Sequence, residues 1–102
     1  MAQNSGDIRA DNEVVDRIKE PGMFHVIFMN DNYTPMDFVV EILQKVFNKS
    51  EKDAHALMMK VHEKGSAIAG TYIEDVALTK SEVASTIAKK NGFPFATKVK
   101  PA

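Results

Sequence analysis

One stretch of this sequence constrains its fold more than any other: a continuous apolar run at positions 23–29 leads directly into a helix-start pattern. The run reads Met-Phe-His-Val-Ile-Phe-Met, and its aromatic and β-branched residues, bounded by turn formers, are typical of a mostly buried strand. The three polar residues at 30–32 predict a turn. After them, Thr34 is suited to cap a helix and Pro35 to occupy its first turn. The sequence therefore predicts a strand, a tight turn and a helix in immediate succession.

Two amphipathic helices follow the turn. The first has one apolar row at helical spacing and a second row beside it, so we expect it to contact two neighbouring elements. These rows are Met36, Val39, Val40, Leu43 and Phe47, and then Phe38, Ile42 and Val46. Ser50 to Asp53 repeats the capping pattern, and Gly65 provides a helix end, so a second helix is predicted between them.

The rest of the chain supplies two more strands and one more helix. Residues 66–73 predict a strand with a bend or bulge around Gly70. A third helix is expected to begin near Thr79 and to end at Asn91 and Gly92. Residues 93–99 predict a last strand, placed at an edge or starting after Pro94. The order β-α-α-β-α-β predicts an α/β (α+β) sandwich of three helices on a three-stranded, mainly antiparallel sheet.

Length and composition limit the classes of function. A chain of 102 residues suits one domain, and its first twenty residues contain no aromatic residue but eight charged ones. We therefore expect a flexible extension at 1–20 and one domain at 21–102. Thirteen basic and fourteen acidic residues give no basic surface for nucleic acid, and no apolar run suits a membrane or a signal peptide. Together with the absence of cysteine, this predicts a cytoplasmic location and excludes a thiol nucleophile.

The residues able to carry chemistry lie in the predicted turn and on the second helix. Asp31 and His62 would suit an acid and a base, but a triad also needs a nucleophile, and the weak candidates Ser66 and Thr34 lie in no catalytic motif. His55 and His62 are two helical turns apart, roughly 10 Å, too far to share a metal ion. We expect no catalytic residue, no metal and no cofactor. An ordinary turn at 30–32 and a solvated His62 remain the simpler alternatives.

Three strings in this sequence together resemble the ClpS family of protease adaptors. They are residues 30–40 (Asn-Asp-Asn-Tyr-Thr-Pro-Met-Asp-Phe-Val-Val), residues 61–65 (Val-His-Glu-Lys-Gly) with Gly70, and the pair Thr79-Lys80. The similarity covers about residues 22–97. It implies a small α/β sandwich that binds N-degrons, substrates whose first residue is bulky and apolar. It also implies a partner, a ClpA-type or ClpC-type AAA+ unfoldase that receives those substrates.

The resemblance also implies which residues form each surface. Asn30, Asp31 and His62 would bind the α-amino group of the substrate, because their acceptors match its three N–H donors. Asn32 and Thr34 would form the rim of the site. An apolar cavity for the first side chain would be lined by Met36, Val39, Met58 and Phe95, and the unfoldase would contact Asp75 and Lys80. In the family, Asn32 often corresponds to a second aspartate and Phe95 to leucine.

A rival hypothesis from another class is a ribosomal-stalk-like domain that binds a protein partner through a helix surface. Such a domain does not need Asn30, Asp31 and His62 to converge on a cavity. Their positions in the folded chain therefore discriminate between the two hypotheses.

Overall fold

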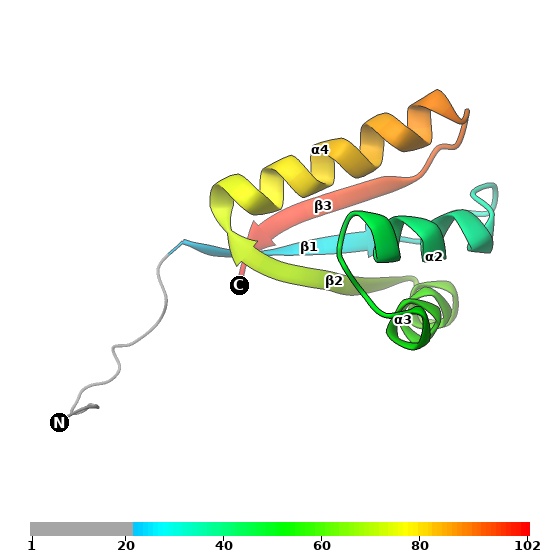
Figure 1. The fold of residues 1–102 in the computed structure, drawn as a ribbon, viewed down its shortest axis with the longest axis horizontal. Coiled ribbons are helices and arrows are strands. Elements are labelled where there is room, and N and C mark those ends of the chain that lie inside the picture. Colours follow the sequence, from blue (N-terminus) through cyan, green and yellow to red (C-terminus); the bar gives the residue numbers. More distant parts are fainter. Residues whose placement is uncertain (1–21) are drawn as a thin grey trace, which may run out of the picture.

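The fold is a three-stranded sheet with three helices, in the order that the sequence predicts (Figure 1). The computed structural model describes residues 22–102, so the predicted extension at 1–20 lies outside the described residues. None of the helices within this range is long and apolar enough to cross a membrane. The elements are β1 (Met23–Met29), α2 (Met36–Lys45), α3 (Glu51–Lys64), β2 (Ser66–Ile73), α4 (Glu74–Lys90) and β3 (Ala96–Pro101).

The sheet has the strand order β2-β1-β3, and both pairings are antiparallel. β3 is an edge strand that begins after Pro94, as the sequence predicts. The β1–β2 register shifts between Val26 and Ile27, which leaves Ala69 as an extra residue beside Gly70 and confirms the predicted bulge. A side chain at position 70 would collide with the phenol of Tyr72, so only glycine lets that ring cross the strand here.

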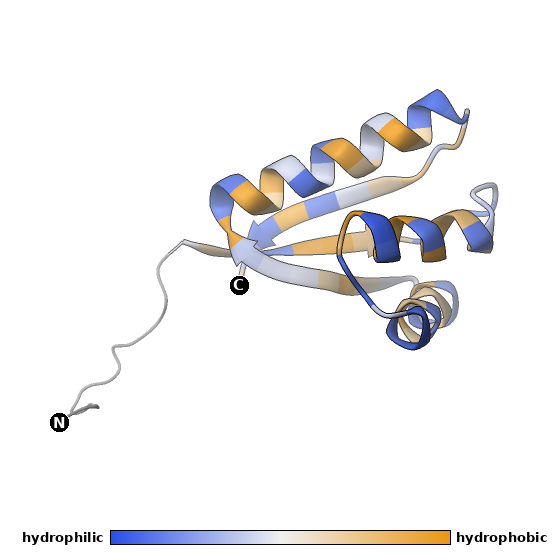
Figure 2. Cartoon of the chain, viewed as in Figure 1, coloured by the Kyte–Doolittle hydropathy of each residue, from blue (hydrophilic) through white to orange (hydrophobic). Residues whose placement is uncertain are grey.

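One face of the sheet carries the hydrophobic core. Val26 and Phe28 from the central strand are almost completely buried, and the Phe28 ring makes edge contacts with Phe47 and Phe95 at centroid distances of 5.2 and 4.8 Å. α4 contacts all three strands through small buried residues, Ala77, Ala84 and Ala88. Figure 2 shows hydrophobic and hydrophilic residues alternating along α2 and α4, as expected for helices with one buried side.

The helix boundaries confirm two predictions and correct two others. Ser50 caps α3 by accepting a hydrogen bond from the Asp53 amide at 3.1 Å, and Gly65 ends that helix in the left-handed conformation (φ 93°). α2 begins at Met36, within the predicted start segment at 34–37, but the prediction that Thr34 caps it is wrong. Its N-cap is Pro35, without a side-chain cap, because the Thr34 side chain donates to Asp31 instead.

The predicted start of α4 is also wrong, because the helix begins at Glu74 rather than near Thr79. Two acidic residues in its first turn favour this earlier start through the helix dipole. Ala77 is fully buried and continues the spacing of the later buried alanines. The capping pattern at 79–82 therefore lies inside the helix, where burial of one helical face outweighs local capping preference.

Candidate functional site

The turn after β1 is organised by the carboxylate of Asp31. Its Oδ1 accepts hydrogen bonds from the amides of Tyr33 and Thr34, both at 2.8 Å, and its Oδ2 accepts from the Thr34 hydroxyl at 2.8 Å. Burial raises the pKa of Asp31, but the three hydrogen bonds together lower it by more than burial raises it. The net pKa of Asp31 therefore lies below its usual value. Asp31 is therefore ionised at neutral pH, and the loop has a defined shape before any ligand arrives.

A backbone contact joins this loop to the end of α3. The Asn30 amide donates to the Gly65 carbonyl at 2.9 Å, and the Gly65 amide donates to the Val61 carbonyl at 2.9 Å. His62 lies in the last turn of α3, next to Val61. The contact brings the first polar residues after β1 to the same end of the molecule as His62. This juxtaposition is the one that the adaptor hypothesis needs and the ribosomal-stalk-like hypothesis does not.

A cavity of about 160 Å³ lies where the loop, the start of α2 and the last turns of α3 meet. Its polar side comes from the loop and from His62, and its apolar side comes from α2 and α3. Three of its apolar residues, Val39, Met58 and Val61, are at least nine-tenths buried, whereas Met36 is 41% exposed. The lining consists of Asn30, Asp31, Asn32, Thr34, Met36, Val39, Met58, Val61 and His62.

The cavity is lined by eight of the nine residues that the family resemblance implied for the amine site, its rim and the apolar pocket. The exception is Phe95, which is absent from the lining. Phe95 is buried in the core, with its ring centroid 4.8 Å from that of Phe28 and 6.3 Å from that of Phe38. Val61 is a lining residue that the prediction missed. The sequence could have indicated Val61, because it follows Met58 by three residues and so lies on the same helical face.

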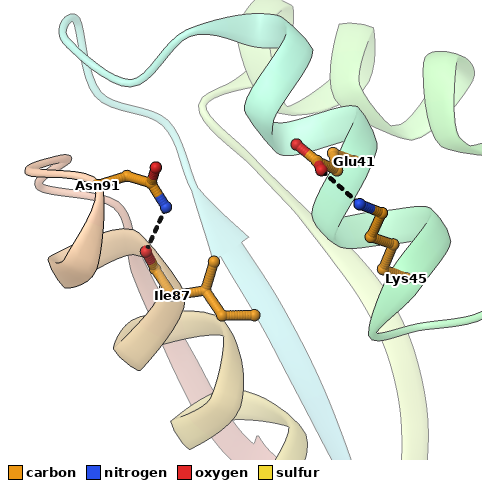
Figure 3. A network of polar contacts seen from close by, with 4 residues as sticks. All are labelled: Glu41, Lys45, Ile87 and Asn91. Carbon is orange, nitrogen blue, oxygen red and sulfur yellow. Dashed lines mark hydrogen bonds and ion pairs between the residues drawn. The ribbon is translucent and has the colours of Figure 1, made fainter.

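A second cavity, of about 250 Å³, lies between α2 and α4. Its polar residues already have partners on their own helices: Lys45 bonds Glu41 at 2.6 Å, and the Asn91 amide donates to the Ile87 carbonyl at 2.8 Å (Figure 3). In the smaller cavity the polar side chains of the loop and of α3 lie beside an apolar wall of Met36, Val39, Met58 and Val61. Convergent polar groups on an apolar wall are typical of ligand sites, so the smaller cavity is the candidate.

Asp75 and Lys80, the two residues expected to contact an unfoldase, differ in their surroundings. Asp75 is exposed in the first turn of α4. The Lys80 ammonium donates to the Val46 carbonyl at 2.7 Å and lies 5.3 Å from the centroid of the Tyr72 ring. Lys80 therefore also has a structural role, since it joins α4 to the carbonyl end of α2.

Two observations bear on metal binding and on the pairing of Asp31 with a histidine. Between residues 22 and 102 there is no group of three His, Cys, Asp or Glu side chains that could hold a metal ion. The Asp31 carboxylate accepts its three hydrogen bonds from Tyr33 and Thr34, so these bonds shape the loop and do not orient a histidine base. The fold and the cavity together define a small α+β domain with a cavity that is polar on one side and apolar on the other.

Comparison with known proteins places this domain in a family. Residues 19–98 match the family described as ATP-dependent Clp protease adaptor protein ClpS. The chain is 46% identical over 86 residues to the ClpS of Treponema denticola, covering 84% of this chain and 85% of the relative. It is 40% identical over 99 residues to that of Desulfatibacillum aliphaticivorans, covering 97% and 93%.

A solved structure agrees with these relatives. Agrobacterium tumefaciens ClpS2 bound to L-phenylalaninamide superposes with a TM-score of 0.78 at 36% identity, covering 81% of this chain and all of that one. The chain belongs to the ClpS family of ATP-dependent Clp protease adaptors. This membership confirms the resemblance seen in the sequence and disfavours the ribosomal-stalk-like alternative.

Proposed function

We propose that this protein binds other polypeptides by their free N-terminal residue, when that residue is Phe, Leu, Tyr or Trp, and delivers them to a Clp AAA+ unfoldase. The observation that carries the proposal is the convergence of Asn30, Asp31 and His62 on one apolar cavity. The Agrobacterium tumefaciens relative, bound to L-phenylalaninamide, supports the same ligand class. The expected cytoplasmic location stays a prediction.

The polar side of the cavity suits a protonated α-amine. Such an amine offers three N–H donors and is largely cationic near neutral pH. Asp31 supplies a negative charge, and a carboxylate offers about four acceptor positions, of which the loop uses three. The side-chain oxygen of Asn30 and a neutral nitrogen of His62 supply further acceptors at the same mouth. The site thus provides charge and acceptors without requiring a bound metal.

The apolar side of the cavity suits a large first side chain. A volume of about 160 Å³ resembles that of engineered apolar cavities, about 150 Å³, that bind benzene. Burying a Phe or Leu side chain contributes about 1.5–3 kcal/mol, and each charge-assisted hydrogen bond about the same. Association itself costs several kcal/mol, so neither group alone gives useful affinity. The proposal therefore requires both the amine and the side chain.

A panel of peptides that differ only in their first residue tests this proposal. We expect Phe, Leu, Tyr and Trp peptides to bind with dissociation constants of about 1 μM or lower, and Gly, Asp and Lys peptides to bind at least about tenfold more weakly. Isothermal titration of each peptide measures the difference. A panel in which the Gly peptide binds as tightly as the Phe peptide would rule out the apolar cavity as the specificity site.

The same peptide panel also tests whether Met36 excludes β-branched first residues, because its partly exposed side chain borders the cavity. A β-branched first residue places an extra methyl group near the mouth, where we expect it to collide with this side chain. Met36→Ala should therefore raise the affinity for Ile and Val peptides about tenfold and change that for the Phe peptide by less than about threefold. If the variant rejects Ile and Val as strongly as the parent protein does, Met36 is not the gate.

For delivery, we propose that the unfoldase, of the ClpA or ClpC type, contacts the start of α4. Exposed Asp75 lies there with two exposed apolar side chains, Ile73 and Leu78, which are 57% and 49% exposed. Lys80 belongs to the same helix. Asp75→Arg should weaken binding to the unfoldase about tenfold and leave the peptide panel unchanged. Unaltered unfoldase binding by this variant would move the contact elsewhere.

A further inference from the structure

Three large apolar side chains are exposed at Met36, which lines the candidate cavity, and at two residues next in sequence to lining residues. They are Tyr33, Met36 and Met59, with exposed fractions of 80%, 41% and 39%. Tyr33 lies in the loop between two lining residues, Asn32 and Thr34. Apolar groups that surround a binding site and remain in water are typical of an interaction surface.

The position of Met59 follows from helix geometry. With about 100° per residue, the cavity-facing residues of α3, Met58, Val61 and His62, share one side of the helix. Met59 projects about 60° beyond His62, on the same edge of the helix. It therefore borders the outer side of the mouth, next to a residue that lines the cavity.

The loop presents Tyr33 in a fixed backbone conformation. The Tyr33 amide donates to Asp31 at 2.8 Å, while its side chain is the most exposed of the large hydrophobic residues described. An aromatic side chain on an ordered loop offers a large contact area at a low cost in conformational entropy. Tyr33, Met36 and Met59 come from the loop, the start of α2 and the second half of α3, the three segments that also supply the cavity lining.

We propose that Tyr33, Met36 and Met59 form an apolar rim that binds the side chains of the second and third residues of the substrate. This subsite rests on the proposed function. With the first residue in the cavity, the chain leaves through the mouth, and successive Cα atoms lie about 3.8 Å apart. The next two side chains must therefore pass the rim. Asp31 is the one carboxylate among the lining residues, so acidic side chains at these positions are disfavoured by repulsion.

The subsite is tested by separating the first residue from those that follow. L-phenylalaninamide probes the cavity alone, whereas amidated Phe-Leu-Leu, Phe-Gly-Gly and Phe-Glu-Glu peptides probe the rim. The full-length protein is titrated beside its Tyr33→Ala and Met59→Ala variants. Ile68→Ala is the matched control, because Ile68 of β2 is 44% exposed, pairs with Ile27 of β1 and does not line the cavity.

We expect the parent protein to bind Phe-Leu-Leu about fivefold more tightly than Phe-Gly-Gly, and Phe-Glu-Glu more weakly than both. Each rim variant should reduce the Leu advantage to less than about twofold without changing the affinity for L-phenylalaninamide, and Ile68→Ala should behave as the parent. Equal affinity of the parent for the Leu and Gly peptides, or an undiminished advantage in both variants, would overturn the rim while the cavity stands. Failure of the parent to bind L-phenylalaninamide would overturn the proposed function, and the subsite with it.

Discussion

Replacing Asp31 by Ala is expected to weaken the binding of a Phe-initiated peptide at least about 100-fold. The carboxylate is the negative charge at the mouth, and each charge-assisted hydrogen bond to it contributes about 1.5–3 kcal/mol. The same carboxylate fixes the Tyr33 and Thr34 amides and the Thr34 hydroxyl, so its removal also releases the loop. A combined loss of about 3 kcal/mol corresponds to that factor.

Asp31→Asn separates the two contributions. An asparagine keeps a side-chain oxygen that accepts from the two loop amides, but it has no negative charge. We expect its affinity to fall about tenfold, between those of the parent and of Asp31→Ala, with a melting temperature close to that of the parent. Titration calorimetry and thermal unfolding of the three proteins measure both effects. Binding by Asp31→Ala within about threefold of the parent would show that this carboxylate is only a turn former.

The lowered pKa of Asp31 sets the sign of its pH dependence. A carboxyl group whose pKa is depressed in the folded state contributes stability that is fully present above its unfolded-state pKa, and that contribution is lost as the pH falls through the folded-state value. At neutral pH the loop is therefore in its organised form. Acidification below about pH 4, near the ordinary pKa of an aspartate, begins to remove this contribution.

Sequence signals were most informative where local chemistry and tertiary burial agree. Ser50 and Gly65 bound α3 as predicted, since the Ser50 cap and the left-handed glycine are local devices. Thr34 shows the opposite case. It fits a helix cap equally well, but the charged acceptor of Asp31 is a stronger partner for its hydroxyl. Sequence spacing does not rank such competing partners.

The composition of the cavity was predictable in part. The loop residues and His62 came from the family resemblance, and the structure brings them together. Phe95, which the same resemblance assigned to the pocket, does not line the cavity, and Val61, which it did not name, does. A helical or strand pattern indicates that a residue faces inward, but it does not say whether that residue borders the core or a cavity. Phe95 packs against Phe28 and Phe38, and Val61 faces the opening.

The second large effect concerns the ligand rather than the protein. Acetylating the N-terminal amine of a Phe-initiated peptide removes its positive charge and all but one of the donors on that nitrogen. Asp31 would then face an uncharged amide, so the charge-assisted contacts are lost together. We expect a loss of at least about 100-fold, while the apolar side chain is unchanged.

The central claim is that one cavity recognises a free α-amine and a bulky first side chain at the same time. Its most direct test is a calorimetric titration of the full-length protein with one Phe-initiated peptide, its N-acetylated form and the same peptide beginning with Gly. We predict a dissociation constant of about 1 μM or lower for the free Phe peptide, about −8 kcal/mol, and binding at least about 100-fold weaker after acetylation. Equal binding of the free and acetylated Phe peptides would contradict the account.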